Sequence, residues 1–349
     1  MWRNFASDWA APAVRSRHRP FPALWIKLRC ALPNCRRSMS AENSQRIVLG
    51  SRGSELARAQ TALVAEALQR VHRDLEIKTE IIKTSGDERK SEPIDPRAGR
   101  KGLFTGEIER ALLAAEIDIA IHSAKDLPSD ATAGLELHGA LPRAAVDDLL
   151  ISKTPGGLGS SRGKAVVATG SVRRQHQLRW KYPGISVVDL RGNVPTRLRK
   201  LLGSDWDAIV LARAGLERLG HDVAGGSFDF EGSLLSVEIL PPEEFLPAGG
   251  QGVIALQVRR DDDNAKRVVD SVNHAETLLC LQAEREFLRL LQGDCGSPVG
   301  VLATITESMM TVRVQIFEPE RIEPRSARVK GEAKSAMQLA QRLWESING

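Results

Sequence analysis

From residue 46 onward, apolar and polar positions follow patterns that predict strands and helices in alternation. Residues 46–57 run from an apolar stretch through a Gly-Ser turn into an amphipathic helix rich in Ala, Leu and Gln. Thr105 is predicted to cap a second helix that continues to about Glu116, and residues 117–122 then alternate like a strand. Between these blocks, residues 83–101 contain almost no apolar side chain, which is typical of a long functional loop.

Three further strands, each followed by a polar turn, are predicted in the middle of the chain, at 165–168, 186–190 and 207–212. This alternation of strands and helices is typical of a doubly wound α/β architecture. A strand over 310–317 and a helix over 336–346 favour a smaller α+β domain at the C-terminal end. The pattern therefore predicts two α/β domains followed by one α+β domain.

The composition is that of a globular protein with several buried cores. The 349 residues are 42% hydrophobic, which is enough for two or three domains. No apolar run approaches the roughly 18 residues that a transmembrane helix needs, so we expect no membrane partner.

Residues 1–38 differ from the rest of the chain. They contain eight Lys or Arg residues, one acidic residue and no helical or strand periodicity. The segment lacks the apolar core of a signal peptide, and two interpretations stay open: an organellar transit peptide, or a start codon assigned too early, with the true start at Met39. We expect residues 1–45 to be unstructured. Without residues 1–38 the net charge changes from +5 to −2, which argues against nucleic-acid binding.

Two cysteines, Cys280 and Cys295, lie outside that basic segment. Because the chain has no secretory signal, this small number favours the reducing cytoplasm over a disulfide framework. Cys280 lies in a helical pattern and is predicted to be a buried apolar residue. Cys295 follows that helix between Gly293 and Gly296, where its thiol would be accessible. Spacing alone leaves open whether Cys295 is reactive.

Charged side chains follow several of the predicted strands. Lys125 and Asp126 follow the strand at 117–122, and arginines follow each of the three strands in the middle of the chain. Ligands of open α/β sheets bind beyond the carboxyl ends of the strands. Arginine pairs with carboxylate or phosphate through two parallel hydrogen bonds, so these arginines predict a small polyanionic ligand. Carboxylate is favoured because the chain lacks a glycine-rich P-loop with its lysine.

Seven motifs in this sequence resemble, in the same order, those of the porphobilinogen deaminase family, whose members are also called hydroxymethylbilane synthases. They are SRGS at 51–54, KGLF at 101–104, HSAKDLP at 122–128, TGSVRR at 169–174, LRGNV at 190–194, PAGGQG at 247–252 and the loop around Cys295. The resemblance extends from about residue 46 to the end of the chain.

The resemblance implies a three-domain protein. Domain 1 would comprise residues 46–143 and 250–270, and domain 2 residues 144–249; both would be doubly wound α/β domains similar to periplasmic binding proteins. Domain 3, residues 275–349, would be a small α+β domain that carries the cysteine loop. The return of the chain to domain 1 is implied by the family alone.

The resemblance also implies a reaction. Family members condense four porphobilinogen molecules head to tail, release ammonia at each step and then free hydroxymethylbilane, for tetrapyrrole and haem biosynthesis. The growing chain is attached to a dipyrromethane cofactor, one per protein chain, through a thioether to the cysteine that matches Cys295. Asp126 matches the catalytic carboxylate, which can stabilise cationic intermediates and transfer protons from the pyrrole nitrogens.

Further site residues are implied position by position. Those that match cofactor-binding positions, besides Cys295, are Ser54, Ser123, Lys125, Thr169, Gly170, Ser171, Arg173 and Arg174. Those that match substrate-binding positions are Arg52, Phe104, Arg191, Arg197, Arg218 and Gln251. Each pyrrole brings an acetate and a propionate, which explains the arginines. Phe104 would pack against pyrrole rings, although a purely structural role is also open.

Two departures from the family pattern stand out. Asp294 precedes Cys295 where the family commonly has glycine, and Gly170 stands where serine is frequent. The resemblance implies a cytoplasmic monomer that acts on a small molecule without a metal. A bilobed solute-binding protein for small anions is the alternative, and a phosphate-ester enzyme is a weaker one because it would need a phosphate loop or a metal-binding carboxylate cluster.

Overall fold

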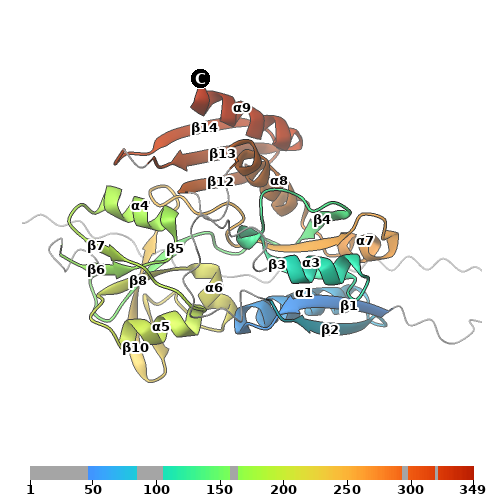
Figure 1. The fold of residues 1–349 in the computed structure, drawn as a ribbon, viewed down its shortest axis with the longest axis horizontal. Coiled ribbons are helices and arrows are strands. Elements are labelled where there is room, and N and C mark those ends of the chain that lie inside the picture. Colours follow the sequence, from blue (N-terminus) through green and yellow to red (C-terminus); the bar gives the residue numbers. More distant parts are fainter. Residues whose placement is uncertain (1–45, 85–104, 158–163, 293–297, 319–320) are drawn as a thin grey trace, which may run out of the picture. The chain divides into compact units, whose positions relative to one another are not determined.

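The computed structural model describes residues 46–84, 105–157, 164–292, 298–318 and 321–349 (Figure 1). The predictions for residues 1–45, for most of the segment 83–101, and for Phe104, Asp294 and Cys295 lie outside the described residues. The described strands form one five-stranded, one six-stranded and one three-stranded sheet.

The five-stranded sheet has the order β2-β1-β3-β11-β4. Its strands are β1 (Arg46–Arg52), β2 (Glu76–Ile82), β3 (Ile119–Ser123), β4 (Leu135–Ala140) and β11 (Ile254–Arg259). β1 is parallel to β2 and β3, whereas β11 is antiparallel to both β3 and β4. A strand more than 110 residues downstream of its neighbours therefore completes this sheet.

Helices cover both faces of this sheet. Ile47 and Leu49 pack into a core with α1 (Glu55–Val71) and α7 (Asp263–Asp270), whereas Val48, between them, packs toward α3 (Gly106–Leu113). Strands that are buried on both faces require continuous apolar runs, which is the pattern in the sequence. Each fully buried Leu or Ile contributes about 1.5–3 kcal/mol to folding.

The six-stranded sheet has the order β7-β6-β8-β5-β10-β9. Its strands are β5 (Asp148–Ser152), β6 (Val166–Ala168), β7 (Ser186–Val188), β8 (Ala208–Ala212), β9 (Ser227–Phe230) and β10 (Ser233–Leu240). The helix α4 (Val172–Lys181) packs on one face, and α5 (Val194–Leu202) and α6 (Arg213–Arg218) pack on the other. The predicted doubly wound α/β class is thus confirmed.

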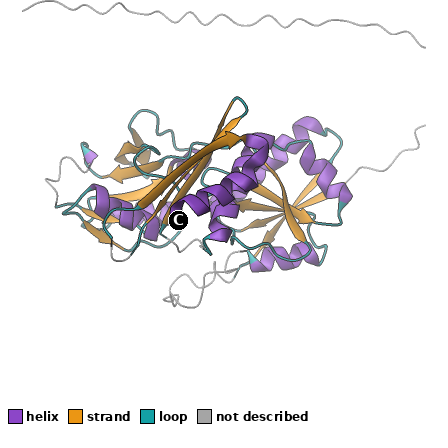
Figure 2. Ribbon diagram, turned by 90° about the horizontal axis from the view of Figure 1, so that it is seen from above, coloured by secondary structure: helices purple, strands orange, loops and turns teal. Residues whose placement is uncertain are grey.

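The third sheet is an antiparallel meander of β12 (Val299–Thr306), β13 (Met309–Ile316) and β14 (Arg325–Glu332). The helices α8 (Ala275–Leu290) and α9 (Ala336–Asn348) pack on it (Figures 1 and 2). Residues of β13 alternate between buried and half-buried, as expected for a sheet with one covered face. The predicted strand at 310–317, the predicted helix at 336–346 and the burial of Cys280 are confirmed.

The start of α3 is confirmed and its end differs from the prediction. Thr105 occupies the predicted N-cap position, although its side chain forms no capping hydrogen bond. The helix ends at Leu113 and not near Glu116, because Ala115 adopts a left-handed backbone with φ of 57° that the helix cannot continue through.

A buried ion pair links the three sheets. Arg143, which lies between β4 and β5, donates from Nη1 to Oε1 of Glu284 on α8 at 2.6 Å. The same carboxylate accepts the backbone N–H of Gly250 at 2.6 Å and of Ala303 at 2.8 Å. Glu284 is fully buried, so loss of one partner would cost about 3–5 kcal/mol. This ion pair therefore holds α8 against the two segments that connect the first and second sheets, at Arg143 and at Gly250.

Candidate active site

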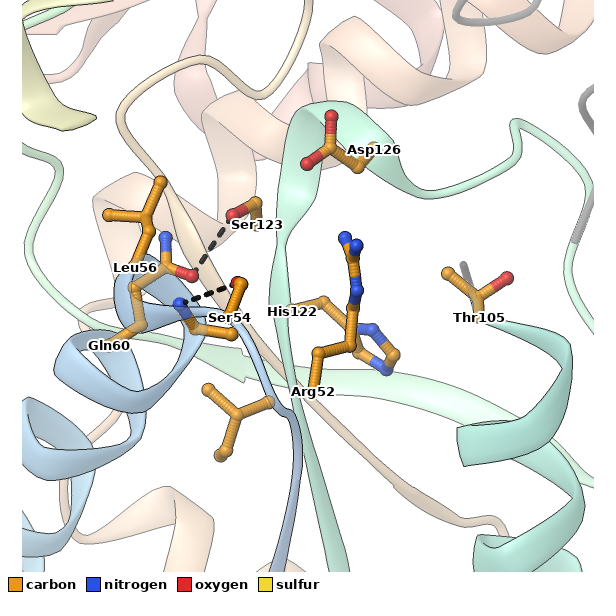
Figure 3. A pocket seen from close by; sticks show the side chains of 10 residues that line it. Arg52, Ser54, Leu56, Gln60, Thr105, His122, Ser123 and Asp126 are labelled. Carbon is orange, nitrogen blue, oxygen red and sulfur yellow. Dashed lines mark hydrogen bonds between the residues drawn. The ribbon is translucent and has the colours of Figure 1, made fainter. Parts of the chain in front are cut away.

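A pocket lies at the carboxyl ends of β1 and β3, where the chain leaves the first sheet (Figure 3). Polar and apolar groups both line it, and the lining comprises Arg52, Ser54, Leu56, Ala57, Gln60, Thr105, Ile121, His122, Ser123 and Asp126. Strand ends are the usual ligand position in an open α/β sheet. The structure thereby brings together four predicted site residues: Arg52, Ser54, Ser123 and Asp126.

Asp126 lies at the end of a short 3-10 turn, Ala124–Asp126, that directly follows β3. The side chain is exposed, and Figure 3 shows it above Arg52 at one side of the pocket. Gly250 packs against this turn with φ of +74°; a Cβ there would lie 2.9 Å from the backbone of Ala124 and Lys125. Only glycine allows this approach, so the glycine-rich segment 247–252 fixes the position of the Asp126 turn.

The Asp126 turn is also held from α8. Arg285 donates from Nη2 to the carbonyl oxygen of Pro128 at 2.7 Å. The helix that leads into the cysteine loop therefore contacts the loop that carries the catalytic candidate.

Lys125 lies beside Asp126 but is partly buried. Burial lowers the pKa of Lys125 to about 8, and the negative charge of Asp126 opposes that effect. At neutral pH the ammonium group therefore persists, but it can lose its proton more readily than an ordinary lysine. Arg174, Asp148 and Arg197 also act electrostatically on Lys125, which places this side chain toward the second sheet.

Two buried polar groups of the pocket have no hydrogen-bond partner within the described part of the chain: Nε2 of Gln60 and Oγ1 of Thr105. The other amide atom of Gln60, Oε1, accepts from Ser123 at 3.0 Å. A buried amide without a partner costs free energy, so these groups fit a polar ligand that would pair with them. Sequence reasoning missed Gln60; its signal is a glutamine on the buried side of an amphipathic helix.

Ser54 and Ser171 begin two of the helices. Ser54 accepts the backbone N–H of Ala57 at the start of α1, and Ser171 accepts that of Arg174 at the start of α4. Capping uses a lone pair of each hydroxyl and leaves its hydrogen for another acceptor. Thr169 is fully buried, and its Oγ1 accepts the backbone N–H of Ser171 at 3.3 Å.

Gly170 packs against the neighbouring strand exit. A Cβ at this position would lie 2.4 Å from the carbonyl oxygen of Leu190. A serine could therefore enter only if the backbone moved, and this accounts for the glycine at this position.

Arg173 and Arg174 are buried and share one carboxylate. Arg173 donates to Oδ2 of Asp148 at 2.8 Å, and Arg174 donates to Oδ1 at 2.6 Å. Gln251 donates to the same Oδ1 at 2.9 Å. Burial by itself would raise the pKa of Asp148, but the two guanidinium groups hold it far below its ordinary value. Asp148 was not among the predicted site residues, because its partners lie 25 and 26 residues away in sequence.

The remaining arginines follow other strands of the second sheet. Arg191 is exposed and pairs with Asp189 at 2.9 Å. Arg197 donates to the carbonyl oxygen of Gly192; burial and the charge of Arg174 lower its pKa to about 10, while Asp126 opposes the shift. Arg218 donates to the carbonyl oxygen of Gly252 at 2.6 Å, and burial lowers its pKa to about 10. All three keep guanidinium N–H groups for an anionic ligand.

The described residues contain neither a candidate metal site nor a candidate membrane-spanning helix. They contain no group of three or more His, Cys, Asp or Glu side chains arranged to hold a metal ion. In the same part of the chain no helix has the length and apolar character that crossing a bilayer requires.

Comparison with known proteins places this geometry in a family. Residues 47–267 match the family model described as porphobilinogen deaminase, dipyromethane cofactor binding domain, and residues 278–349 match the porphobilinogen deaminase C-terminal domain. A protein of Nitrobacter winogradskyi named porphobilinogen deaminase is 42% identical over 280 residues, 79% of this chain and 84% of that protein. A protein of the same name from Roseiflexus sp. is 41% identical over 272 residues, 78% of this chain and 86% of that protein.

One solved structure illustrates a weak likeness in fold. The second substrate binding domain of GlnP from Lactococcus lactis, in an open conformation, matches with a TM-score of 0.39 and 11% identity over 73% of this chain and 94% of that domain. The α/β description therefore rests on the sheet topology of this chain, and its relationships rest on the sequence matches. Since those matches span both the α/β part and the C-terminal sheet, the chain belongs to the porphobilinogen deaminase family.

Proposed function

We propose that the chain is a hydroxymethylbilane synthase, a transferase of tetrapyrrole biosynthesis. It joins four porphobilinogen molecules head to tail, with release of ammonia at each addition, and then frees the linear product by hydrolysis. The observation that carries this proposal is the match of both family domains over residues 47–267 and 278–349. A solute-binding protein is no longer favoured, because the family models account for the C-terminal domain as well.

The pocket residues fit a dipyrromethane group. Such a group offers carboxylates and pyrrole N–H groups, and the pocket offers the guanidinium group of Arg52. It also offers a buried amide donor on Gln60 and a buried hydroxyl on Thr105, and these two groups have no partner within the described residues. When bound through Cys295, the group supplies a nucleophilic terminal pyrrole carbon. Ser54, Ser123 and Lys125 would donate to its carboxylates or stabilise its position.

Asp126 is the proposed catalytic residue. A fixed carboxylate stabilises the cation that remains when ammonia leaves porphobilinogen, and it accepts the proton that the new bond releases. Its exposure and its place beside Arg52 in the pocket support this role. Because Asp126 ends a turn clamped by Gly250 and Arg285, its position needs little reorganisation during the reaction.

The arginines are proposed to bind substrate and cofactor carboxylates. Arg52, Arg191, Arg197 and Arg218 would bind the substrate and the growing chain, with Gln251 and Phe104 beside them. Arg173, Arg174, Thr169, Gly170 and Ser171 would contact the cofactor. Nε of Arg173 and of Arg174 has no partner within the described residues, so each guanidinium keeps one donor beyond its bonds to Asp148. We further propose that the protein acts as a cytoplasmic monomer.

The proposed domains are 46–143 with 250–270, then 144–249, then 275–349. The position of β11 between β3 and β4 supports the return of the chain to the first of them.

Intact mass of the purified full chain tests the proposal. We expect an adduct of two pyrrole units on the native protein and on Cys280→Ser, and none on Cys295→Ser. The native protein should also consume porphobilinogen and release ammonia. An active protein with an unmodified Cys295 would overturn the tether, and a loaded protein without turnover would overturn the reaction.

A further inference from the structure

His122 is a buried histidine in the wall of the pocket, four residues before Asp126. It is 5% exposed, and its Nε2 lies 3.0 Å from Oε1 of Gln257. Gln257 belongs to β11, which pairs with β3 beside His122. Figure 3 shows the His122 ring next to the Arg52 side chain, on the side of Thr105. None of the proposed roles above uses this histidine.

A chain of hydrogen bonds extends from His122 to a carboxylate. Nε2 of Gln257 donates to Oε1 of Glu109 on α3 at 3.0 Å. The other carboxylate oxygen, Oε2, accepts from Thr132 at 2.9 Å. The bonded residues are 148 and 23 positions apart in sequence, so only the folded chain forms this relay.

The carboxylate determines the direction of every bond in the relay. An ionised carboxylate only accepts, so the amide NH₂ of Gln257 must face Glu109. Its carbonyl oxygen must then face His122, and that oxygen can only accept. The bond to His122 therefore requires a hydrogen on Nε2.

The charges around His122 disfavour a second proton. Arg52 on β1 and Arg285 on α8 both act on the ring as positive charges. Asp126 is the acidic residue among those that line the same pocket, and Glu109 is separated from the ring by Gln257. Burial is the largest effect: it lowers the pKa of His122 to about 4, with the bond to Gln257 opposing and the two arginines assisting. At neutral pH, His122 is uncharged.

We propose that the Glu109–Gln257 relay holds His122 as a neutral imidazole with its proton on Nε2, which makes His122 a positioning residue for Arg52 and Asp126. The inference rests on the proposed function. A neutral ring leaves Arg52 as the cation and Asp126 as the anion of the pocket lining. A protonated ring would repel Arg52 and attract Asp126 or a substrate carboxylate, and it would thereby misplace the groups that act on porphobilinogen.

An exchange variant, Glu109→Gln with Gln257→Glu, tests the relay while it keeps one amide and one carboxylate. The carboxylate would then contact the ring directly, and the pKa of His122 should rise by about one to three units. A matched control is Gln69→Glu, which introduces the same side chain on the exposed end of α1.

The measurement is a long-range ¹H–¹⁵N spectrum of the full chain labelled at histidine, titrated from pH 5 to 8, with His122 assigned from His122→Gln. We expect an Nε2-protonated neutral ring at pH 6 in the native protein and in Gln69→Glu, and a raised pKa in the exchange variant. A proton on Nδ1 or an imidazolium at pH 6 in the native protein overturns the proposal, even if the exchange variant fails to fold.

Kinetics then separate this inference from the proposed function. In the exchange variant, the fall in kcat relative to the native protein should follow the fraction of imidazolium: about tenfold more at pH 6 than at pH 8 when the pKa of His122 rises by three units to about 7, and little when it rises by one. Equal loss at both pH values in a variant whose measured His122 pKa has reached about 7 would overturn the positioning role. Absence of porphobilinogen turnover in the native protein would instead overturn the proposed function, while the spectrum would still decide the state of His122.

Discussion

The two α/β sheets share a strand arrangement but differ in the chemistry at their strand ends. In each, three parallel strands are followed by one antiparallel strand and then by a strand that pairs antiparallel with it: β2-β1-β3 with β11 and β4, and β7-β6-β8 with β5 and β10; the second sheet adds β9 at its edge. At the first sheet the aspartate, Asp126, is exposed in a pocket. At the second sheet the aspartate, Asp148, is fully buried between two arginines.

This contrast separates an aspartate that holds the fold from one that is available for chemistry. A buried carboxylate persists as an ion only when it is paired, and Asp148 is paired twice. Among the described residues, no ion pair involves Asp126, so its charge remains available to a cationic intermediate. Topology alone therefore does not distinguish the proposed catalytic carboxylate from a structural one; the immediate surroundings of each carboxylate do.

The largest loss of stability is expected from a substitution in the second sheet. Asp148→Asn removes the charge that compensates Arg173 and Arg174, and it should lower the free energy of unfolding by about 3–5 kcal/mol. Denaturant titration measures this. Asp147→Asn is the control, because that neighbouring side chain is partly exposed and lies 3.7 Å from Arg213. Equal, small losses in both variants would contradict the structural role of Asp148.

Asp126→Asn should show the reverse behaviour. Unfolding free energy should change by no more than about 0.5 kcal/mol, because an exposed side chain is replaced by one of equal size. Turnover of porphobilinogen should fall by about 100-fold or more, while the cofactor still loads. Asp130→Asn, another exposed position on the same loop, is the control. Near-native turnover in Asp126→Asn would remove this residue from the catalytic role.

The sheets should also differ in their response to acid. The folded-state pKa of His122, about 4, lies below its ordinary 6.5, so the unfolded chain binds this proton first as pH falls. Stability should be complete above pH 6.5 and should decline toward pH 4, by at most about 3 kcal/mol. The pKa of Asp148 is also lowered, but its contribution is lost only below about 3.8. When the free energy of unfolding is measured against pH, the decline between pH 6.5 and 4 should therefore be smaller in His122→Gln than in the native protein. An unchanged profile would contradict this.

The smallest change in turnover is expected from substitutions at two glycines with similar φ angles. Gly250 and Gly220 have φ of +74° and +85°. A Cβ at Gly250 would contact the Asp126 turn, whereas a Cβ at Gly220 would have no other atom within 4 Å among the described residues. Gly220→Ala should cost about 1–2 kcal/mol in backbone strain and leave turnover unchanged. Gly250→Ala should cost more and also lower turnover. Identical effects of the two substitutions on turnover would show that the contact with the turn is unimportant.

Local patterns predicted most of the elements, because a strand or a helix is encoded by neighbouring residues. The apolar runs before Arg52, Lys125 and Thr169 are strands, and the turns that follow them carry charged and hydroxyl side chains, as expected. The failure at the end of α3 is also local: the end of the helix before Ala115 depends on a backbone angle that composition does not specify.

The sequence by itself determined the α/β class, the family and the identity of the candidate groups. Only the tertiary structure decided their states. Asp148 neutralises arginines 25 and 26 residues away, and Gln257 orients a histidine 135 residues away. Burial and ion pairing depend on which segments meet, since a charge responds to neighbours in space and not in sequence. For this reason the motif at 122–128 was enough to predict Asp126 as a candidate, whereas the hydrogen-bond partner of His122 could be identified only from the pairing of β11 with β3.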